Sequence, residues 1–530
     1  MNYRLILFCI SCFSVFVGGF EAFSAIVGSW AGDEWKQIWT LWVCGAATYI
    51  AGATGYFLLK PQTEEQRKAG LREGYAIAGL GWLAASVLGA LPFFFSAKMH
   101  WYDALFESAS GFTTTGVALI HPGYLMTNGE VLENGVESLS KGIVFWRALE
   151  SWFGGIGIVV LMAAFLPKFS RGIQKLYNAE TPGLKSSDTQ IAPSTKKSAI
   201  KLSVLYAIIT IAEIVLLILA RMNPFEAVCN SFTTVSTGGF CTRQDSIAYF
   251  QSNPDSIFHS NLITLIVIFF MFISGVNFFL HVRLFSGKPL SYFKDEEFRV
   301  YTGIIVIVSS IIAFSLFFGG SEGSAYHFDK SGGVVRNLHA IGRSFRDAVF
   351  QVTSFMTSTG FTNVKNYCAW PPIGAALLVG ISVIGGCGGS TAGGLKCVRA
   401  LLVFYQSKAE VKHSIFPQLV TSVKLNNVRV KAPAIQKTVA FFIAYIGIII
   451  IFALLLPLVC SACEWETGLS ASITCLSNVG PGVGQIGPGG LGHFDWLNPA
   501  SKLLLSAEMI IGRLELFTIL VLLLPSFWRK

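Results

Sequence analysis

Long apolar segments alternate with short polar ones along almost the whole chain. A helix of about 20 apolar residues spans the hydrocarbon core of a membrane, and ten segments are long and apolar enough to do so. They are residues 4–29, 37–59, 74–96, 142–167, 201–221, 260–282, 300–319, 373–405, 436–459 and 502–527. Arg4 precedes the first apolar run as in a signal peptide, but the run is long and we interpret it as a retained span. The pattern therefore predicts an all-α polytopic membrane protein.

Four of the segments between these spans share a second pattern. Each holds a short, moderately apolar stretch that ends in a small, hydroxyl-rich turn with a glycine. They read "YDALFESASGFTTTGVAL" (102–119), "FEAVCNSFTTVSTGGFCT" (225–242), "RDAVFQVTSFMTSTGFTN" (346–363) and "ETGLSASITCLSNVGPGV" (466–483). Aligned on Gly116, Gly238, Gly360 and Gly480, they recur at intervals of 122, 122 and 120 residues. A near-constant interval of this kind indicates an internal repeat.

Each of these segments has one apolar span before it and one after it, which we call the exit span. Segments of about 10–14 residues are too short to cross a bilayer and fit re-entrant segments. Irregular backbone at membrane depth persists only where protein buries it or where it lines water. The sequence therefore predicts four helix–pore-loop–helix repeats in a pseudo-fourfold arrangement around one pore, plus two extra N-terminal transmembrane helices. We expect the extra pair at 1–72 and the repeats at 73–168, 169–284, 285–408 and 409–530.

The four turns have the composition of a cation filter. A cation that loses its hydration shell needs several oxygen ligands, which rings of backbone carbonyls supply. Glycine tolerates the backbone angles that aim successive carbonyls at one axis, and the preceding short helices would direct partial negative charge toward it. Any single turn is also compatible with an ordinary loop, so the hypothesis depends on all four. The predicted filter residues are Thr114, Thr115, Gly116, Ser236, Thr237, Gly238, Ser358, Thr359, Gly360, Asn478, Val479 and Gly480.

The exit span 373–405 is interrupted by "IGGCGGSTAGGLK" (384–396), which places six glycines in thirteen positions. None of the other three exit spans contains such a run. Close helix packing through small residues is the alternative, but it usually needs fewer glycines. We interpret the run as a gating loop beneath the filter, in which glycines permit a change of shape. Its predicted residues are Gly385, Gly386, Gly388, Gly389, Ser390, Thr391, Gly393, Gly394 and Lys396.

Arg513 lies within the last span, where an ionised group costs several kcal/mol unless it faces protein or water. It either forms a local ion pair with Glu508 or Glu515, or lies in the pore in contact with the gating loop. Arg147 and Glu150 are nearer the outer end of a span, and we interpret them as an interface pair.

Acidic residues precede the filter turns. They are Asp103, Glu107, Glu226 and Asp347. They could concentrate cations at the mouth of the pore, or Asp103 and Asp347 could cap the short helices.

Composition and charge agree with a membrane protein. The 530 residues are 53% hydrophobic and 13% charged, with a mean hydropathy of +0.59, whereas soluble domains carry roughly 25% charged residues. If both termini are cytoplasmic, the inner segments hold 26 of the 39 Lys and Arg, in line with the positive-inside rule. This distribution explains the net charge of +9 without nucleic acid.

No motif points to catalysis. The eleven cysteines show no metal-type spacing, and Cys460 and Cys463 leave a disulfide or a redox site open. The sequence contains neither a zinc-protease HExxH nor a GxxxxGK[ST] nucleotide motif. We therefore expect no enzyme activity and no cofactor.

Three motifs resemble those of the Trk/Ktr/HKT superfamily of potassium transporters, most closely its bacterial Trk-type members. They are "ESASGFTTTG" (107–116), "FWRALESWFGGIGIVVL" (145–161) and "GGSTAGGLKCVRALL" (388–402). The resemblance covers essentially the whole chain and implies a single-chain pore with one filter glycine per repeat. Glycine in all four repeats implies preference for potassium, with rubidium also permeant. The fourth turn departs from the pattern, since Pro481 follows its glycine, so we expect looser selectivity than in a symmetric channel.

The resemblance also implies a gating loop at 385–396 and a functional arginine at Arg513, which favours the pore position for that side chain. It further implies a homodimer in a bacterial inner membrane and a cytosolic nucleotide-binding regulatory subunit (TrkA-like) at the basic inner loops. The alternatives are a sodium-permeable or cation-coupled transporter of the same fold, or a non-conducting channel-like sensor or scaffold.

Overall fold

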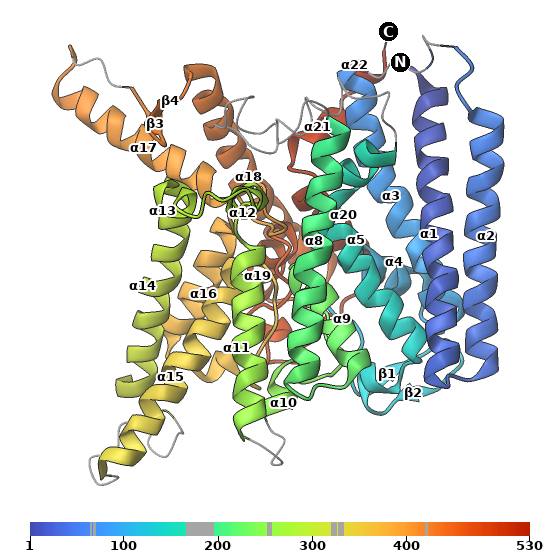
Figure 1. The fold of residues 1–530 in the computed structure, drawn as a ribbon, viewed down its shortest axis with the longest axis horizontal. Helices are drawn as coiled ribbons and strands as arrows, with labels where there is room; N and C mark the ends of the chain where they lie inside the picture. The colour runs from blue at the N-terminus through green and yellow to red at the C-terminus, as the bar shows by residue number, and fades with distance from the viewer. Residues whose placement is uncertain are drawn as a thin grey trace.

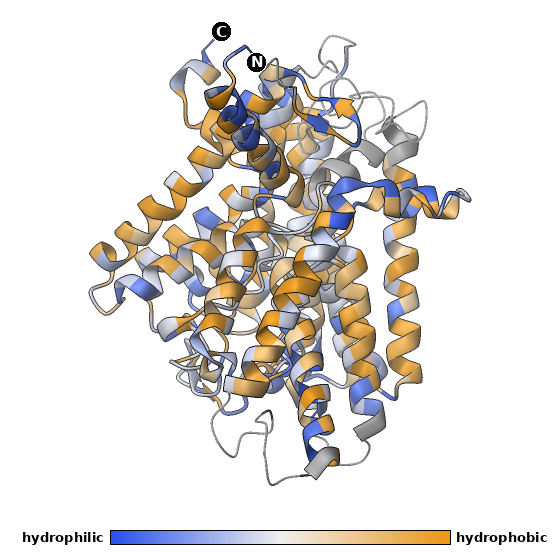
Figure 2. Cartoon of the chain, turned by 90° about the vertical axis from the view of Figure 1, so that its left-hand side faces the viewer, coloured by the Kyte–Doolittle hydropathy of each residue, from blue (hydrophilic) through white to orange (hydrophobic). Residues whose placement is uncertain are grey.

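The computed structural model describes residues 1–63, 66, 70–165, 195–251, 257–319, 326, 333–418 and 422–529. Most of the predicted inner segment 168–201 lies outside the described residues. Figure 1 shows a bundle of helices with the two ends of the chain close together at one end of the molecule. Figure 2 shows hydrophobic residues along most of the length of these helices, as the hydropathy pattern predicts.

Six single helices are long and apolar enough to span a membrane within the described residues. They are α1 (Tyr3–Ala31), α2 (Trp35–Leu59), α3 (Leu71–Phe95), α8 (Thr195–Leu219), α14 (Glu296–Gly319) and α18 (Ala432–Val459). Each coincides with a predicted span. The other four predicted spans are the exit spans of the repeats, and they have a different form.

Each exit span is broken or sharply bent. Their helices are α5 (Lys141–Phe165), α11 (Ile257–Ser274) with α12 (Phe278–Phe285), α16 (Pro372–Ile384) with α17 (Cys397–Ile415), and α20 (Pro499–Arg513) with α21 (Phe517–Leu522) and α22 (Pro525–Trp528). Helix α5 is kinked at Gly157, where φ is 76°, and α11 and α12 meet at an angle of 100°. At the last break, Glu515 and Leu516 both have positive φ.

Sequence analysis identified only the break at 385–396, because a run of glycines is visible in a sequence. A break made by one glycine or by a pair of left-handed residues leaves no such signal.

A short helix precedes each filter turn, as predicted. These pore helices are α4 (Trp101–Phe112), α9 (Pro224–Val235), α15 (Gly333–Met356) and α19 (Trp465–Leu476). The third is a correction, since its helix begins thirteen residues before the predicted segment at 346 and has twice the length of the others.

The segments between the long helices contain short strands and short helices. Two antiparallel hairpins pair β1 (Tyr124–Leu125) with β2 (Val131–Leu132) and β3 (Lys424–Leu425) with β4 (Val428–Arg429). The remaining short helices are α10 (Ala248–Gln251), α13 (Ser291–Lys294), η1 (Gly135–Ser138), η2 (Tyr367–Ala369) and η3 (Gly484–Ile486).

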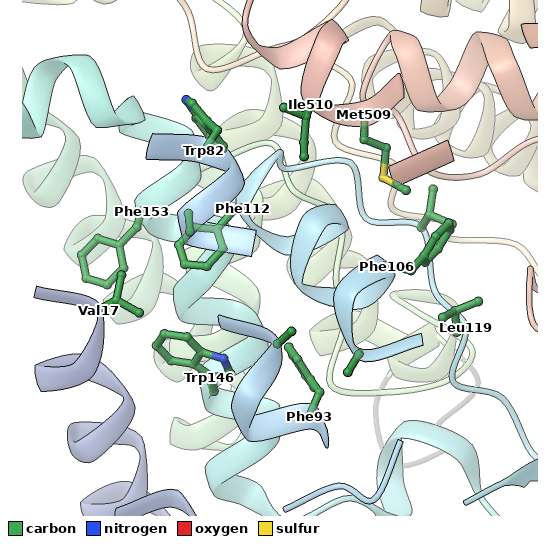
Figure 3. Packing of buried hydrophobic residues seen from close by; sticks show 14 of the residues in the cluster. Val17, Trp82, Phe93, Phe106, Phe112, Leu119, Trp146, Phe153, Met509 and Ile510 are labelled. Carbon is green, nitrogen blue, oxygen red and sulfur yellow. The ribbon is translucent and has the colours of Figure 1, made fainter. Parts of the chain in front are cut away.

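The N-terminal pair α1 and α2 packs as a tight hairpin on the first repeat. A Cβ on Gly18 would lie 2.4 Å from Tyr49 N, and one on Gly45 would lie 2.6 Å from Ala22 N, so the two backbones touch through small residues, as membrane helices often do. Figure 3 shows Val17 of α1 against Phe153 of α5, beside the buried rings of Phe112 and Trp146.

We expect Gly45→Leu to lower the thermal unfolding temperature of the purified protein in detergent, because its side chain would push α2 away from α1. Overpacking of this kind costs about 1–3 kcal/mol. Gly19→Leu is the matched control, since Gly19 is on the same hairpin and has open space at its Cβ position. Equal unfolding temperatures for the two variants would contradict the tight packing of this pair.

Candidate functional site

The four pore helices end in the same backbone turn. In each repeat, the second residue after the helix has positive φ. The third residue after the helix donates its N–H to the carbonyl oxygen of the residue five positions earlier. The donors are Thr115, Gly238, Thr359 and Val479, with N···O distances of 2.7–2.9 Å. The residues with positive φ are Thr114, Thr237, Ser358 and Asn478, all between 53° and 57°. Non-glycine residues rarely adopt this conformation, so four at equivalent positions define the register of the repeat.

This register corrects the prediction for the second repeat by one residue. The equivalent of Gly116, Gly360 and Gly480 is Gly239, with φ of 69°, whereas Gly238 does not have positive φ. The sequence "STGGF" offers two adjacent glycines, and the near-constant interval selected the first of them. Gly238 instead corresponds to Thr115, Thr359 and Val479, the residues that precede the glycine.

The four turns form a closed ring of contacts. A Cβ built on Gly116 would lie 2.3 Å from the carbonyl oxygen of Gly238, and one on Gly239 would lie 1.9 Å from that of Thr359. The ring continues with Gly360 at 2.0 Å from the Val479 oxygen and closes with Gly480 at 2.5 Å from the Thr115 oxygen. Each repeat therefore places its glycine against one carbonyl oxygen of the next repeat, and a Cβ at any of the four positions would displace that oxygen.

The side chains of the ring do not share the fourfold pattern of its backbone. Repeats one and three each pair two threonine hydroxyls, Thr113 with Thr115 at 2.7 Å and Thr357 with Thr359 at 2.8 Å. Repeat four has Asn478 instead, whose amide donates to Thr115 Oγ1 at 3.0 Å and to the Met509 carbonyl at 3.0 Å. The chemistry of the turns is thus unequal although their backbones match.

A cavity of about 210 Å³ lies on one side of the ring and is lined by all four glycines of the corrected register, Gly116, Gly239, Gly360 and Gly480. The same cavity reaches the loops that include Gln244, Asp245 and Lys365. We call it the outer cavity, because these loops lie at the end of the molecule away from the two termini.

A buried ion pair braces the outer cavity between repeats one and two. Arg147 donates from Nε to Glu107 Oε1 at 2.6 Å, and both side chains are almost fully buried. The guanidinium also lies 3.5 Å from the ring centre of Phe240, and Glu107 Oε2 accepts from the N–H of Leu119. The predicted pair of Arg147 with Glu150 is wrong, because Glu150 instead accepts from Ser108.

The other acidic residues near the turns are also paired. Asp103 accepts from Lys502 Nζ at 2.6 Å, Glu226 pairs with Arg243, and Asp347 pairs with Arg346. Capping by Asp103 and Asp347 is wrong, because α4 is capped at His100 and α15 begins at Gly333. The partners of Asp103 and Glu226 lie on other elements, whereas Arg346 is next to Asp347 on α15.

Two histidines join the outer loops of repeats one and four. The rings of His121 and His493 stack with centres 3.6 Å apart, and His121 Nε2 lies 3.3 Å from Asp495. Burial, followed by the neighbouring His121, lowers the pKa of His493 to about 4. His493 is therefore neutral at neutral pH, and the stack carries no charge repulsion there.

A second cavity, of about 130 Å³, lies on the other side of the ring and is lined by Asn478, the stretch 389–394, Lys396 and Arg513. We call it the inner cavity. The predicted gating residues therefore lie together, next to the predicted filter. Their roles as gate and filter stay predictions, since the structure shows positions and contacts only.

The loop 385–396 is held directly beneath the turns. Gly393 N donates to Ser358 Oγ at 2.6 Å, and Thr391 Oγ1 lies 3.0 Å from the Val235 carbonyl at the end of α9. A Cβ on Gly393 would lie 2.2 Å from the Ser477 carbonyl oxygen, and one on Gly385 would lie 2.2 Å from that of Gly393. The glycines thus permit close packing as well as unusual backbone angles.

Arg513 lies in the inner cavity and contacts this loop. It donates to the carbonyl of Thr391 at 2.8 Å and to that of Gly154 at 2.6 Å, at the level of the α5 kink. The two candidate local partners bind elsewhere, since Glu508 contacts Ser472 and Glu515 pairs with Arg399. The geometry therefore matches the position in the pore rather than the local ion pair.

Sequence reasoning missed Glu297, which anchors the loop. Its Oε1 accepts from Gly388 N at 2.6 Å and from Val398 N at 2.9 Å, so one carboxylate binds both the loop and the first turn of α17. The only signal in the sequence was an acid at the start of an apolar span. Lys396 Nζ, predicted to bind a carboxylate or the inner interface, donates to the Ala392 carbonyl within the loop.

Cys460 and Cys463 are both free and buried. Among the residues that the structure describes, no group of three or more His, Cys, Asp or Glu side chains could hold a metal ion. The ring, its two cavities and the loop therefore form the candidate site.

Comparisons with known proteins match the chain over most of its length. The sequence model of a family described as "TrkH: Cation transport protein" matches residues 44–530. The chain is 36% identical over 485 residues to the Trk system potassium uptake protein TrkH of Escherichia coli (strain K12), covering 91% of each. It is 29% identical over 498 residues to TrkG of the same strain, covering 93% of each. The crystal structure of the potassium transporter TrkH from Vibrio parahaemolyticus matches with a TM-score of 0.82, 30% identity and full coverage of both chains.

The corrected register is testable by comparing Gly239→Ala with Gly238→Ala. We expect Gly239→Ala to lower cation flux and its preference for potassium, because its Cβ would meet the Thr359 carbonyl oxygen at 1.9 Å in a backbone conformation that alanine disfavours. Gly238→Ala should retain more flux, because Gly238 does not have positive φ and its Cβ would lie 2.8 Å from Ser151 Cβ rather than 1.9 Å from a carbonyl oxygen of the ring. The measurement is ion uptake into liposomes by protein that elutes as a single peak. The opposite order of the two variants would restore the uncorrected alignment.

Proposed function

The chain belongs to the TrkH family of cation transport proteins, and we propose that it carries potassium across a membrane through a gated pore. The observation that supports the proposal most directly is the closed ring of Gly116, Gly239, Gly360 and Gly480. Four carbonyl oxygens, each against the glycine of the preceding repeat, resemble the carbonyl ligands that replace the hydration shell of potassium in channels.

The proposed path runs from the outer cavity through the ring into the inner cavity. The ring separates two cavities lined by different residues, so an ion that moves between them passes the four turns. The pore-helix ends that surround the ring carry partial negative charge, which favours a cation. We propose that the transported ion is the ligand of this chain and that it holds no cofactor.

The proposed gate is the loop 385–396 with Arg513. In this conformation the loop is hydrogen-bonded to Ser358 and to the end of α9, directly beneath the ring. Arg513 adds a positive charge in the inner cavity, which repels cations and ties the loop to α5. Conduction requires these contacts to break, so we propose that the structure represents a closed state.

The unequal turns support a selectivity that is looser than in a symmetric channel. Repeats one and three offer paired threonine hydroxyls, while Asn478 in repeat four is committed to Thr115. Because the ligands are not equivalent, the fit to one ion radius is less strict. We propose that rubidium also passes and that sodium passes more slowly.

We also propose the cellular setting implied by the family. The chain would lie in a bacterial inner membrane with both termini in the cytoplasm, which agrees with the excess of Lys and Arg in the predicted inner segments and with the position of both ends at one end of the bundle. It would form a homodimer and bind a TrkA-like cytosolic nucleotide-binding subunit. Nucleotide control would act through that subunit.

The function is tested by ion uptake into liposomes that contain the purified protein, with potassium, rubidium and sodium compared. We expect potassium and rubidium uptake well above sodium uptake. Gly360→Ser should erode this preference, because its Cβ would lie 2.0 Å from the Val479 oxygen and displace a ligand. Gly303→Ser is the matched control, since Gly303 lies on α14 with open space at its Cβ position.

Equal uptake of potassium and sodium would retain the pore and remove the proposed preference. If no cation is taken up, the protein is either a transporter with a closed gate or a non-conducting scaffold. A variant that lacks part of residues 385–394 distinguishes these two explanations. Uptake by that variant identifies the loop as the gate, and its absence contradicts the proposed transport.

A further inference from the structure

Glu508 is a fully buried carboxyl group in the membrane part of the chain. It lies on α20, which packs against α4, α18 and α19, and its side chain has no exposure to solvent. It is one turn before Gly512 and Arg513 on the same helix. The proposed transport path does not use it, so its presence needs a separate explanation.

The hydrogen atoms around Glu508 can be counted. Ser472 Oγ of α19 lies 2.5 Å from Glu508 Oε1 and 3.1 Å from the carbonyl oxygen of Ile449 on α18. A serine hydroxyl has one hydrogen to donate, and a backbone carbonyl oxygen only accepts. If Ser472 donates to Ile449, the hydrogen between Ser472 and Glu508 must come from the carboxyl group.

The second carboxyl oxygen supports the same assignment. Glu508 Oε2 is buried and has no hydrogen-bond partner among the described residues. An ionised carboxylate with one bare oxygen at membrane depth would cost several kcal/mol. The neutral acid has only an ordinary carbonyl oxygen at that position, which is much less costly.

The groups that face Glu508 do not offer a substitute for the proton. On α18, the Tyr445 hydroxyl is bonded to Ser477, and on α19 Cys475 is a free, buried cysteine. On α4, Asp103 is paired with Lys502, which also pairs with Asp495. On α20 itself, Arg513 donates to carbonyl oxygens of the gating loop and of α5.

The related position in the first repeat behaves differently. Glu150 occupies the place of Glu508, since it lies four residues before Gly154 as Glu508 lies four before Gly512. Ser108 occupies the place of Ser472, since each lies five residues before the C-cap of its pore helix. Ser108 Oγ lies 2.9 Å from Glu150 Oε1. Ser108 is free to donate to Glu150, because no second acceptor of its hydroxyl is recorded in the described part of the chain. Glu150 Oε2, like Glu508 Oε2, is buried without a hydrogen-bond partner among the described residues, but of these two serines only Ser472 has a second acceptor recorded.

We propose that Glu508 is a proton-binding site, in which the carboxyl group donates to Ser472 Oγ and Ser472 in turn donates to the Ile449 carbonyl. The relay links α20, α19 and α18 behind the fourth turn. Loss of the proton would redirect the Ser472 hydrogen to Glu508 and release Ile449. It would also place a negative charge beside the pore helix that ends at Leu476.

The test is the infrared spectrum of the purified full-length protein at neutral pH. A protonated carboxyl group has a C=O stretch that is distinct from the bands of a carboxylate. We expect the wild-type minus Glu508→Gln difference spectrum to contain such a band. Glu130→Gln, which changes an exposed acid in an outer hairpin, should give no such band. This measurement does not depend on transport, so its result tests the proton-binding site separately from the proposed function.

A difference spectrum without the band would overturn the proposal, because the acid would then be ionised. Ser472→Ala provides a second variant, which removes the acceptor and leaves the acid in place. We expect it to shift the same band to higher frequency, since the acid loses a strong acceptor. An unchanged band in Ser472→Ala would overturn the relay.

A role in transport rests on the proposed potassium function. We expect wild-type potassium uptake to change at alkaline pH, when the buried acid ionises, and Glu508→Gln to lose that dependence while it keeps the neutral-pH rate. A structural role alone would lower the rate of the Gln variant at every pH. An alkaline response that persists in Glu508→Gln would contradict control of transport by this proton.

Discussion

The contact between a glycine and the carbonyl oxygen of the next repeat is the constraint on which the site depends. At each of the four positions, a Cβ would lie 2.5 Å or less from that oxygen, so the four turns approach one another as closely as backbones can. Backbone at membrane depth must be buried in protein or line water. The ring satisfies this requirement by packing the turns against each other, with pore helices behind them and a cavity on either side.

The breaks in all four exit helices follow from the same crowding. Four straight helices at the level of the turns would meet the ends of the pore helices. Gly154 and Gly512 show this directly, since a Cβ on either would lie about 2 Å from the last carbonyl of its own pore helix. Bending just beyond these glycines opens the inner cavity and creates the space that the loop 385–396 fills. The glycine run is thus one of four solutions to one steric problem, and it is the solution that also places a loop on the axis.

Several buried charged side chains are in contact with a partner. Arg147 with Glu107 and Lys502 with Asp103 tie the outer ends of helices together, while Glu297 binds backbone N–H groups of the loop. Pairs of this kind are costly to break, because removal of one partner leaves a buried charge. They therefore fix the relative positions of repeats whose small turns have few side-chain contacts of their own. Glu508 differs from them, and the hydrogen count around Ser472 explains how an unpaired acid is retained.

The sequence by itself determined the membrane class, the six straight spans, the repeat and the interrupted third exit span. These features are local, because span length, hydropathy and glycine content are properties of contiguous residues. It placed nine of the twelve proposed filter residues in register with the backbone of their turns. The three of the second repeat are one position early, because it took Gly238 for Gly239 and only φ distinguishes two adjacent glycines. The tertiary structure alone decided the partners of Arg147, Glu297, Arg513 and Glu508, because these contacts join helices up to several hundred residues apart. Which carbonyl lies against which glycine was likewise decided only when the four repeats closed into a ring.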